Sequence, residues 1–127
     1  MTGRSTVQWA ALAFGVIYLV AGVLGFIPSL QTNHALFGIF QVNLLHNLLH
    51  VVIGIGGLAA VSSLANSRTF CQVVGVILLL LGVIGIGIPN PLGLLYIGQA
   101  DIPLHLVSGA VLAYFGFAAP VSTRSRA

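Results

Sequence analysis

Asn43-Leu-Leu-His-Asn-Leu-Leu-His-Val-Val-Ile-Gly54 brings polar side chains into a long apolar run and spaces them as a helix does. His46 and His50 are four residues apart, so a helix places them one turn apart on one face, with Asn47 at the edge of that face. The apolar run continues to Leu64. The stretch predicts a membrane-spanning helix with a small polar site at one end.

The composition excludes an ordinary water-soluble domain. Of the 127 residues, 58% are hydrophobic and 4% are charged, whereas about a quarter of residues are charged in soluble domains. The mean hydropathy is +1.13. The net charge of +3 reflects a scarcity of acids, since Asp101 is the single one, and it indicates no nucleic-acid partner. One cysteine, Cys71, excludes an intramolecular disulfide and a thiolate metal cluster.

Four apolar runs are long enough to cross a bilayer. The shortest has 18 residues, which at ~1.5 Å per residue covers about 27 Å of a ~30 Å hydrocarbon core. Segments of this length in lipid must be helical, because lipid offers the backbone no hydrogen-bond partners. The sequence therefore predicts an all-α membrane protein with four transmembrane helices, over Val7 to Ile27, Leu44 to Leu64, Phe70 to Ile88 and Ile102 to Ala119.

The arginines predict the orientation. The connections at 28–42 and 89–101 contain no lysine or arginine, whereas the termini and the connection between the second and third runs contain Arg4, Arg68, Arg124 and Arg126. Positive residues stay on the cytoplasmic side. We expect a multi-pass protein of the cytoplasmic (inner) membrane with both termini in the cytoplasm.

The two halves of the chain resemble each other. Residues 15–25 match residues 75–85, and each run then stops at a proline, Pro28 or Pro89. Both outer connections contain a Gln followed two residues later by Asn or Asp. We interpret residues 1–127 as one membrane domain of two parallel repeat hairpins, 1–66 and 67–127. Chance similarity between glycine-rich spans is the alternative.

The segments between the apolar runs also allow structural predictions. The apolar outer connections are expected to lie along the membrane interface and fold back onto the bundle. Asn43 and Asp101 are expected to cap the helices that follow them, because their side-chain oxygens can accept from free N–H groups. Residues 65–69 predict a short polar turn on the inner side.

Glycines spaced seven apart place small residues on one stripe of three helices, where backbones can approach closely. Such a stripe is typical of packing within the chain, and the alternative is an interface for another subunit. The glycines concerned are Gly15, Gly22, Gly75, Gly82, Gly109 and Gly116.

Three histidines and an asparagine form a candidate polar cluster near the outer membrane face: His46, Asn47, His50 and His105. Polar groups at such depth are functional candidates by default. Paired histidines can bind a metal, and His50 with His105 can ligate a b-type haem. The simplest interpretation is structural: the side chains hydrogen-bond carbonyls of the outer connections, and neither metal nor cofactor is needed.

The spans contain no ionisable Asp, Glu, Lys or Arg side chain that predicts a proton relay or coupling-ion site, since Asp101 is interpreted as a cap. The sequence also lacks a nucleophile with a matching base and acid, and a phosphate-binding glycine loop. We therefore predict no catalytic residues and no enzyme activity.

The chain resembles an uncharacterised family of four-span bacterial membrane proteins, best represented in actinobacteria and known by a domain-of-unknown-function label. Three stretches carry the resemblance: residues 22–28, the His-Asn-x-x-His stretch at 43–50, and residues 101–109. The resemblance implies a membrane protein without an assigned activity.

The functional hypothesis is a non-enzymatic accessory subunit that contacts membrane lipids and other membrane subunits, for example in an envelope lipid transporter or a respiratory assembly. The alternative is a small homo-oligomeric transporter or lipid-binding protein. A b-type haem electron-transfer protein is the third hypothesis.

Overall fold

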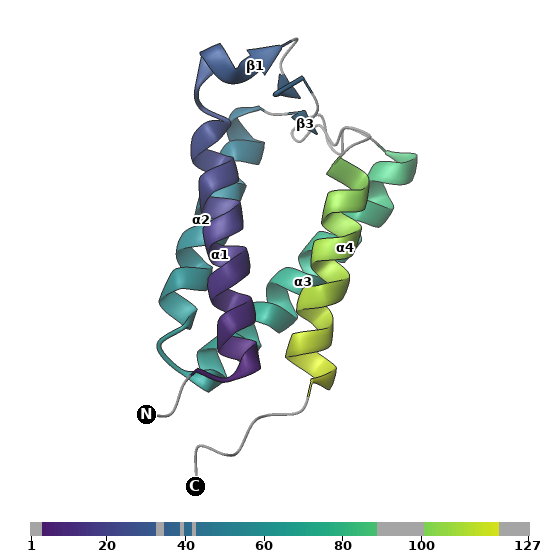
Figure 1. Ribbon diagram of the computed structural model, residues 1–127. Coiled ribbons are helices and arrows are strands. Elements are labelled where there is room, and N and C mark those ends of the chain that lie inside the picture. The colour runs from purple at the N-terminus through teal and green to yellow at the C-terminus, as the bar shows by residue number, and fades with distance from the viewer. Residues whose placement is uncertain (1–3, 33–34, 39, 42, 89–100, 120–127) are drawn as a thin grey trace, which may run out of the picture.

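The computed structural model describes residues 4–32, 35–38, 40–41, 43–88 and 101–119, and these are mostly helical, as expected for an all-α membrane protein (Figure 1). The long helices are α1 (Thr6–Leu24), α2 (Leu44–Ala60), α3 (Leu64–Gly87) and α4 (Asp101–Ala113). A π-helix, η3 (Tyr114–Ala118), continues α4. Between α1 and α2 lie the 3-10 helix η1 (Pro28–Leu30) and the strands β1 (Gln31–Thr32), β2 (Ala35–Leu36) and β3 (Phe40–Gln41).

Three helical segments are long and apolar enough to cross a membrane: α1, α3, and α4 together with η3. The fourth, α2, is apolar but has 17 residues, about 26 Å at ~1.5 Å per residue and at the lower limit for a span. Large apolar side chains cover the outside; Val52 and Ile86, for example, are 63% and 67% exposed. Such a surface is suited to contact with lipid.

The turn between α2 and α3 lies earlier than the sequence predicted. It comprises residues 61–63, and the predicted polar turn at 65–69 is wrong because those residues form the start of α3. The Ser63 side chain accepts from the backbone N–H of Asn66 at 3.0 Å and caps the helix. The Ser67 hydroxyl donates to the Ala60 carbonyl at 2.9 Å. Polar side chains here terminate one helix and begin the next.

A small antiparallel sheet forms part of the connection between α1 and α2. Its order is β1-β2-β3, with Thr32 opposite Ala35 and Leu36 opposite Phe40. The turn after β2 needs two residues with positive φ, Phe37 at 55° and Gly38 at 73°. Ala35 and Leu36 are buried, so this part of the connection folds back onto the protein. The other outer connection, residues 89–100, lies outside the described residues.

The helices pack as two pairs, α1 with α2 and α3 with α4 (Figure 1). A methyl group added at Gly15 would lie 3.0 Å from the backbone nitrogen of Leu58, and one at Gly75 would lie 2.6 Å from that of Ala113. The other four glycines of the predicted stripes face the same two interfaces, namely Gly22, Gly82, Gly109 and Gly116. These glycines therefore pack inside the chain.

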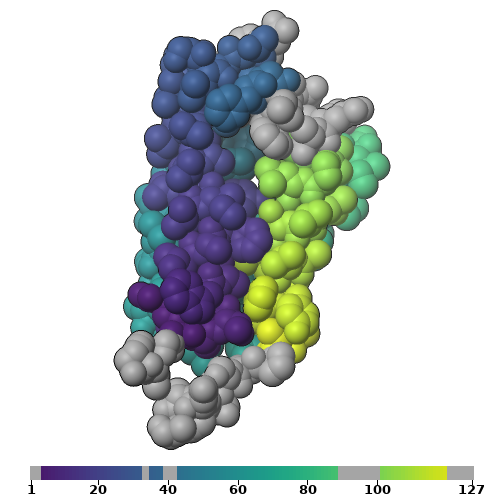
Figure 2. Space-filling model, in the orientation of Figure 1, coloured from purple at the N-terminus to yellow at the C-terminus, as the bar shows by residue number. Residues whose placement is uncertain are grey.

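The two pairs share an apolar core toward the end that holds the α2–α3 turn. Val7, Cys71 and Leu112, from three different helices, are all fully buried there. The Gln8 side-chain amide donates to the Val61 carbonyl at 2.9 Å and attaches the start of α1 to that turn. Figure 2 shows α1 and α4 bordering each other on the surface. The histidines lie toward the opposite end of the helices.

Candidate metal centre

The start of α2 is fixed by its own cap. The Asn43 backbone is extended, with φ of −147°, and its side-chain oxygen accepts from the N–H of His46 at 2.7 Å. This bond satisfies one of the free donors of the first turn. It also places His46 in that turn, with His50 one turn further along the same face.

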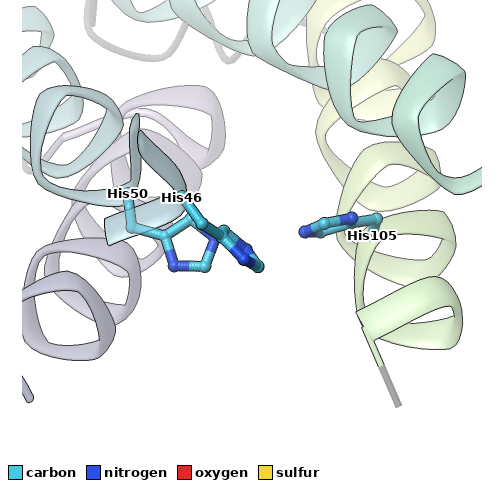
Figure 3. Close-up of side chains that lie close together, drawn as sticks. All are labelled: His46, His50 and His105. Carbon is cyan, nitrogen blue, oxygen red and sulfur yellow. The ribbon is translucent and has the colours of Figure 1, made fainter. Parts of the chain in front are cut away.

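Three histidines converge from two helices of different pairs. His46 and His50 extend from α2, and His105 extends toward them from α4 (Figure 3). One ring nitrogen of each lies within 4.8 Å of the other two. The Nε2 atoms of His46 and His50 are 3.1 Å apart and share a hydrogen bond. The side chains are 2%, 7% and 1% exposed, so water is almost excluded from this triad, which we call the histidine cluster.

Neighbouring rings orient the cluster. The Tyr18 ring, from α1, meets the His50 ring edge-on with centroids 5.0 Å apart. The His105 centroid lies 5.9 Å from that of His46 and 6.2 Å from that of His50. Sequence reasoning missed Tyr18, because an aromatic residue in an apolar span carries no signal that distinguishes this packing role. Its ring restricts the position of His50.

His105 is the histidine of the cluster whose ring nitrogens have the fewest hydrogen-bond partners. Within the described part of the chain, neither of its ring nitrogens has a hydrogen-bond partner, although the residue is buried. A buried imidazole without partners costs free energy, about 1–3 kcal/mol for a neutral polar group.

One helical turn earlier, Asp101 is the first residue of α4 and is also buried. Asp101 therefore lies inside the first turn, where the helix dipole favours an anion.

Asn47 belongs to a different contact. Its side-chain amide donates to the Gly25 carbonyl at 2.8 Å, and the Gln31 amide donates to the same oxygen at 2.7 Å. Gly25 ends α1, so Asn47 links the two helices of the first pair. The structure thus separates the predicted four-residue polar cluster into a helix link at Asn47 and the histidine cluster. His34 lies outside the described residues.

A second polar contact lies far from the histidines. The π-helix leaves the Gly116 carbonyl to accept from the Gln72 amide at 2.9 Å and the Arg68 guanidinium at 3.1 Å. Both donors are on α3, so the contact attaches the end of α4 to α3. The contact gives the polar side chains of Arg68 and Gln72 a partner within the protein.

The three ring nitrogens of the histidine cluster form a donor set that is suited to a metal ion. Neutral imidazole is the commonest metal ligand among protein side chains, and it suits zinc, copper, iron and nickel. The search of curated proteins and the search of solved structures each returned no match. Residues 8–118 match the model of a domain of unknown function, DUF4383. Since the match covers most of the sequence, the chain belongs to the DUF4383 family.

Proposed function

We propose that this chain is a non-enzymatic integral membrane protein that binds one first-row transition-metal ion, with Zn²⁺ as the reference case, through His46, His50 and His105. The observation that carries the proposal is the convergence of three buried ring nitrogens within 4.8 Å of one another. Two helix pairs supply them, so the ion links halves of the molecule that otherwise meet mainly at the other end.

The distances suit a single ion after small ring movements. Imidazole nitrogens at about 2.0 Å from a tetrahedral ion lie about 3.3 Å from one another. The His46 and His50 Nε2 atoms are already 3.1 Å apart, and the remaining separations do not exceed 4.8 Å. Side-chain rotation of one or more rings would bring the three nitrogens to the spacing that a single ion requires. One Nε2 atom donates to the other in the His46–His50 pair, so for both to ligate an ion that proton would have to move to Nδ1 of its ring.

The same geometry favours an ion over a haem. Axial ligation by His50 and His105 requires the porphyrin to pass between their rings, about 2 Å from each nitrogen. The His46 Nε2 atom lies 3.1 Å from the His50 Nε2 atom, in the space that the macrocycle needs. Three converging nitrogens match a three-histidine ion site, which keeps a fourth position for another ligand.

We retain the predicted topology as part of this proposal: four spans, repeat hairpins, and both termini in the cytoplasm of an actinobacterial cell. The arrangement of α1–α2 and α3–α4 as matching pairs supports the repeat. The absence of lysine and arginine from residues 28–42 and 89–101 supports the orientation. The histidine cluster then lies toward the outer face.

The accessory-subunit hypothesis and its lipid-binding alternative are both compatible with a metal site. Glycine stripes do not support the subunit interface, because the six glycines pack against helices of this chain. The lipid-binding alternative is favoured by an apolar pocket beside the histidine cluster. Purification in mild detergent separates the hypotheses: an accessory subunit is recovered with different membrane proteins, and a self-contained lipid-binding protein is recovered alone or with copies of itself.

Metal titration tests the main proposal. Purified, chelator-treated protein is expected to bind one Co²⁺ per chain, with the intense visible bands of a tetrahedral site, and Zn²⁺ is expected to displace it. His105→Ala and the ring-preserving His105→Phe each remove one ligand and should weaken Co²⁺ binding at least about 100-fold. Asn66→Ala, at an exposed position of α3, is the control.

Elution volume and circular dichroism show whether each variant is folded. Folded wild-type protein that takes up no Co²⁺ or Zn²⁺ would refute the proposal. Unchanged affinity in folded His105→Phe would refute the assignment of His105 as a ligand.

A further inference from the structure

An apolar pocket of about 330 Å³ lies beside the histidine cluster, between α2 and α3. All three histidines contribute to its wall. The volume is at the lower end of the range for small-molecule sites. Apart from the histidines, the residues that line it carry no polar side chain, and they are Leu49, Val52, Ile53, Gly56, Phe70, Val74, Ile77, Leu78 and Leu81.

The pocket is elongated along the helices, with the histidines at one end. On α2 its lining runs from His46 to Gly56, ten residues and therefore about 15 Å. Phe70 marks the far end, since a methyl group added at Gly56 would lie 3.8 Å from the Phe70 ring. Val52, in the wall, is 63% exposed. With α2 and α3 spanning the membrane, as proposed, a molecule dissolved in the bilayer would enter sideways, between these two helices.

Charge indicates the kind of head group that completes the site. Three neutral imidazoles leave a divalent ion with its full charge in a water-poor environment, where an uncompensated charge is costly. Asp101 is buried one turn from His105 on α4, and as a carboxylate it would offset one of the two charges of the ion. One positive charge remains, and a monoanion that ligates the ion at its fourth position neutralises it.

We propose that the pocket binds a fatty-acid carboxylate from the membrane, with its head group on the metal ion and its alkyl chain between α2 and α3. This inference rests on the proposed metal-binding function. The carboxylate supplies the missing negative charge and an oxygen ligand, and the alkyl chain meets only apolar side chains in the described lining. A hydrophilic anion has no partner along that lining.

The Co²⁺ form, reconstituted in nanodiscs of zwitterionic lipid, tests the inference. Dodecanoate is expected to change the visible spectrum saturably, at a concentration at least tenfold lower than acetate requires. Methyl dodecanoate, which has the same chain without a carboxylate, is expected to leave the spectrum unchanged. Gly56→Leu fills the far end of the pocket and should weaken dodecanoate binding at least tenfold, with acetate and Co²⁺ binding unaffected. Gly87→Leu is the matched control, because a side chain there meets nothing within 4 Å.

The outcomes separate the two proposals. Failure of the protein to bind Co²⁺ refutes the metal-binding function, and the inference with it. Normal Co²⁺ binding combined with equal potency of dodecanoate and acetate, or with no spectral response to dodecanoate, refutes the inference alone. Equal dodecanoate binding by Gly56→Leu and Gly87→Leu refutes the placement of the alkyl chain.

Discussion

Gly109→Ala tests whether close backbone contact holds the second helix pair together. The added methyl carbon would lie 2.7 Å from the Leu79 backbone nitrogen and 2.9 Å from the Gly75 carbonyl oxygen. Ordinary contacts begin at 3.4 Å, so α3 and α4 must separate locally by 0.7 Å, the difference between 3.4 and 2.7 Å. The Leu79 side-chain Cγ atom lies 2.8 Å away as well, but the other two obstructing atoms belong to the backbone, so side-chain rotation alone cannot relieve the overlap.

The magnitude follows from two opposing terms. Overpacking of this kind costs about 1–3 kcal/mol, and a gap of ~0.5–1 Å removes a quarter to a half of the dispersion energy of the separated atoms. Replacing glycine by alanine in a helix recovers up to ~1 kcal/mol. We expect a net loss of about 1–2 kcal/mol in the free energy of unfolding. His105, one turn before Gly109, moves with α4, so Co²⁺ affinity is also expected to fall.

Reversible unfolding in mixed micelles with increasing SDS, followed by circular dichroism, measures the change. Gly87→Ala is the control, because nothing lies within 4 Å of an added methyl group there. It should be neutral or slightly stabilising. If Gly109→Ala proves as stable as Gly87→Ala, close packing between α3 and α4 is not what stabilises the pair.

Three further predictions concern the first helix pair, the ion and the orientation. Asn47→Ala leaves the Gly25 carbonyl with one fewer donor and should lower the free energy of unfolding by about 1–2 kcal/mol, whereas exposed Asn66→Ala should not; equal stability of the two variants would contradict the link. Zn²⁺ at 100 times its dissociation constant should stabilise the protein by about 2.7 kcal/mol, and EDTA should reverse the effect; identical unfolding curves with and without Zn²⁺ would contradict a link between the pairs. In a Cys71→Ser background, Thr32→Cys should react with a membrane-impermeant maleimide added outside the cell; reaction from the cytoplasmic side alone would contradict the orientation.

Most of the helical architecture follows from the sequence, because apolar run length and glycine spacing are strong signals. The Asn43 cap and the one-turn spacing of His46 and His50 are local features that the chain order determines. The α2–α3 turn was placed too late, because Asn66 and Arg68 resemble loop residues. In the structure they belong to a helix that Ser63 caps. Strands of two residues are too short for a periodic pattern, so the small sheet had no sequence signal.

The composition of the histidine cluster depended on helix rotation, which the sequence does not determine. The spacing on α2 is compatible with Asn47 facing either the histidines or α1. In the structure its side-chain amide donates to the Gly25 carbonyl, so Asn47 faces α1. Aligning Asn43 with Asp101 places His105 opposite Asn47, whereas matching residues 50–54 with 105–109 places it opposite His50, so the repeat does not determine which residue His105 corresponds to. Only the packing of α4 against α3, through Gly109 and Gly116, turns His105 toward α2.

The separation of roles along the helices explains why a metal ion suits this protein. Each pair is held by close backbone contact at glycines, and the shared core joins the pairs through residues such as Val7 and Leu112 near the α2–α3 turn. Toward the other end, α2 and α4 face each other through the imidazole rings of His46, His50 and His105. Ring contacts between neutral imidazoles contribute little in lipid, where no hydrophobic effect drives them together. Coordination of one ion by three rings would be a far stronger interaction, and it would make the distance between the two pairs depend on the metal.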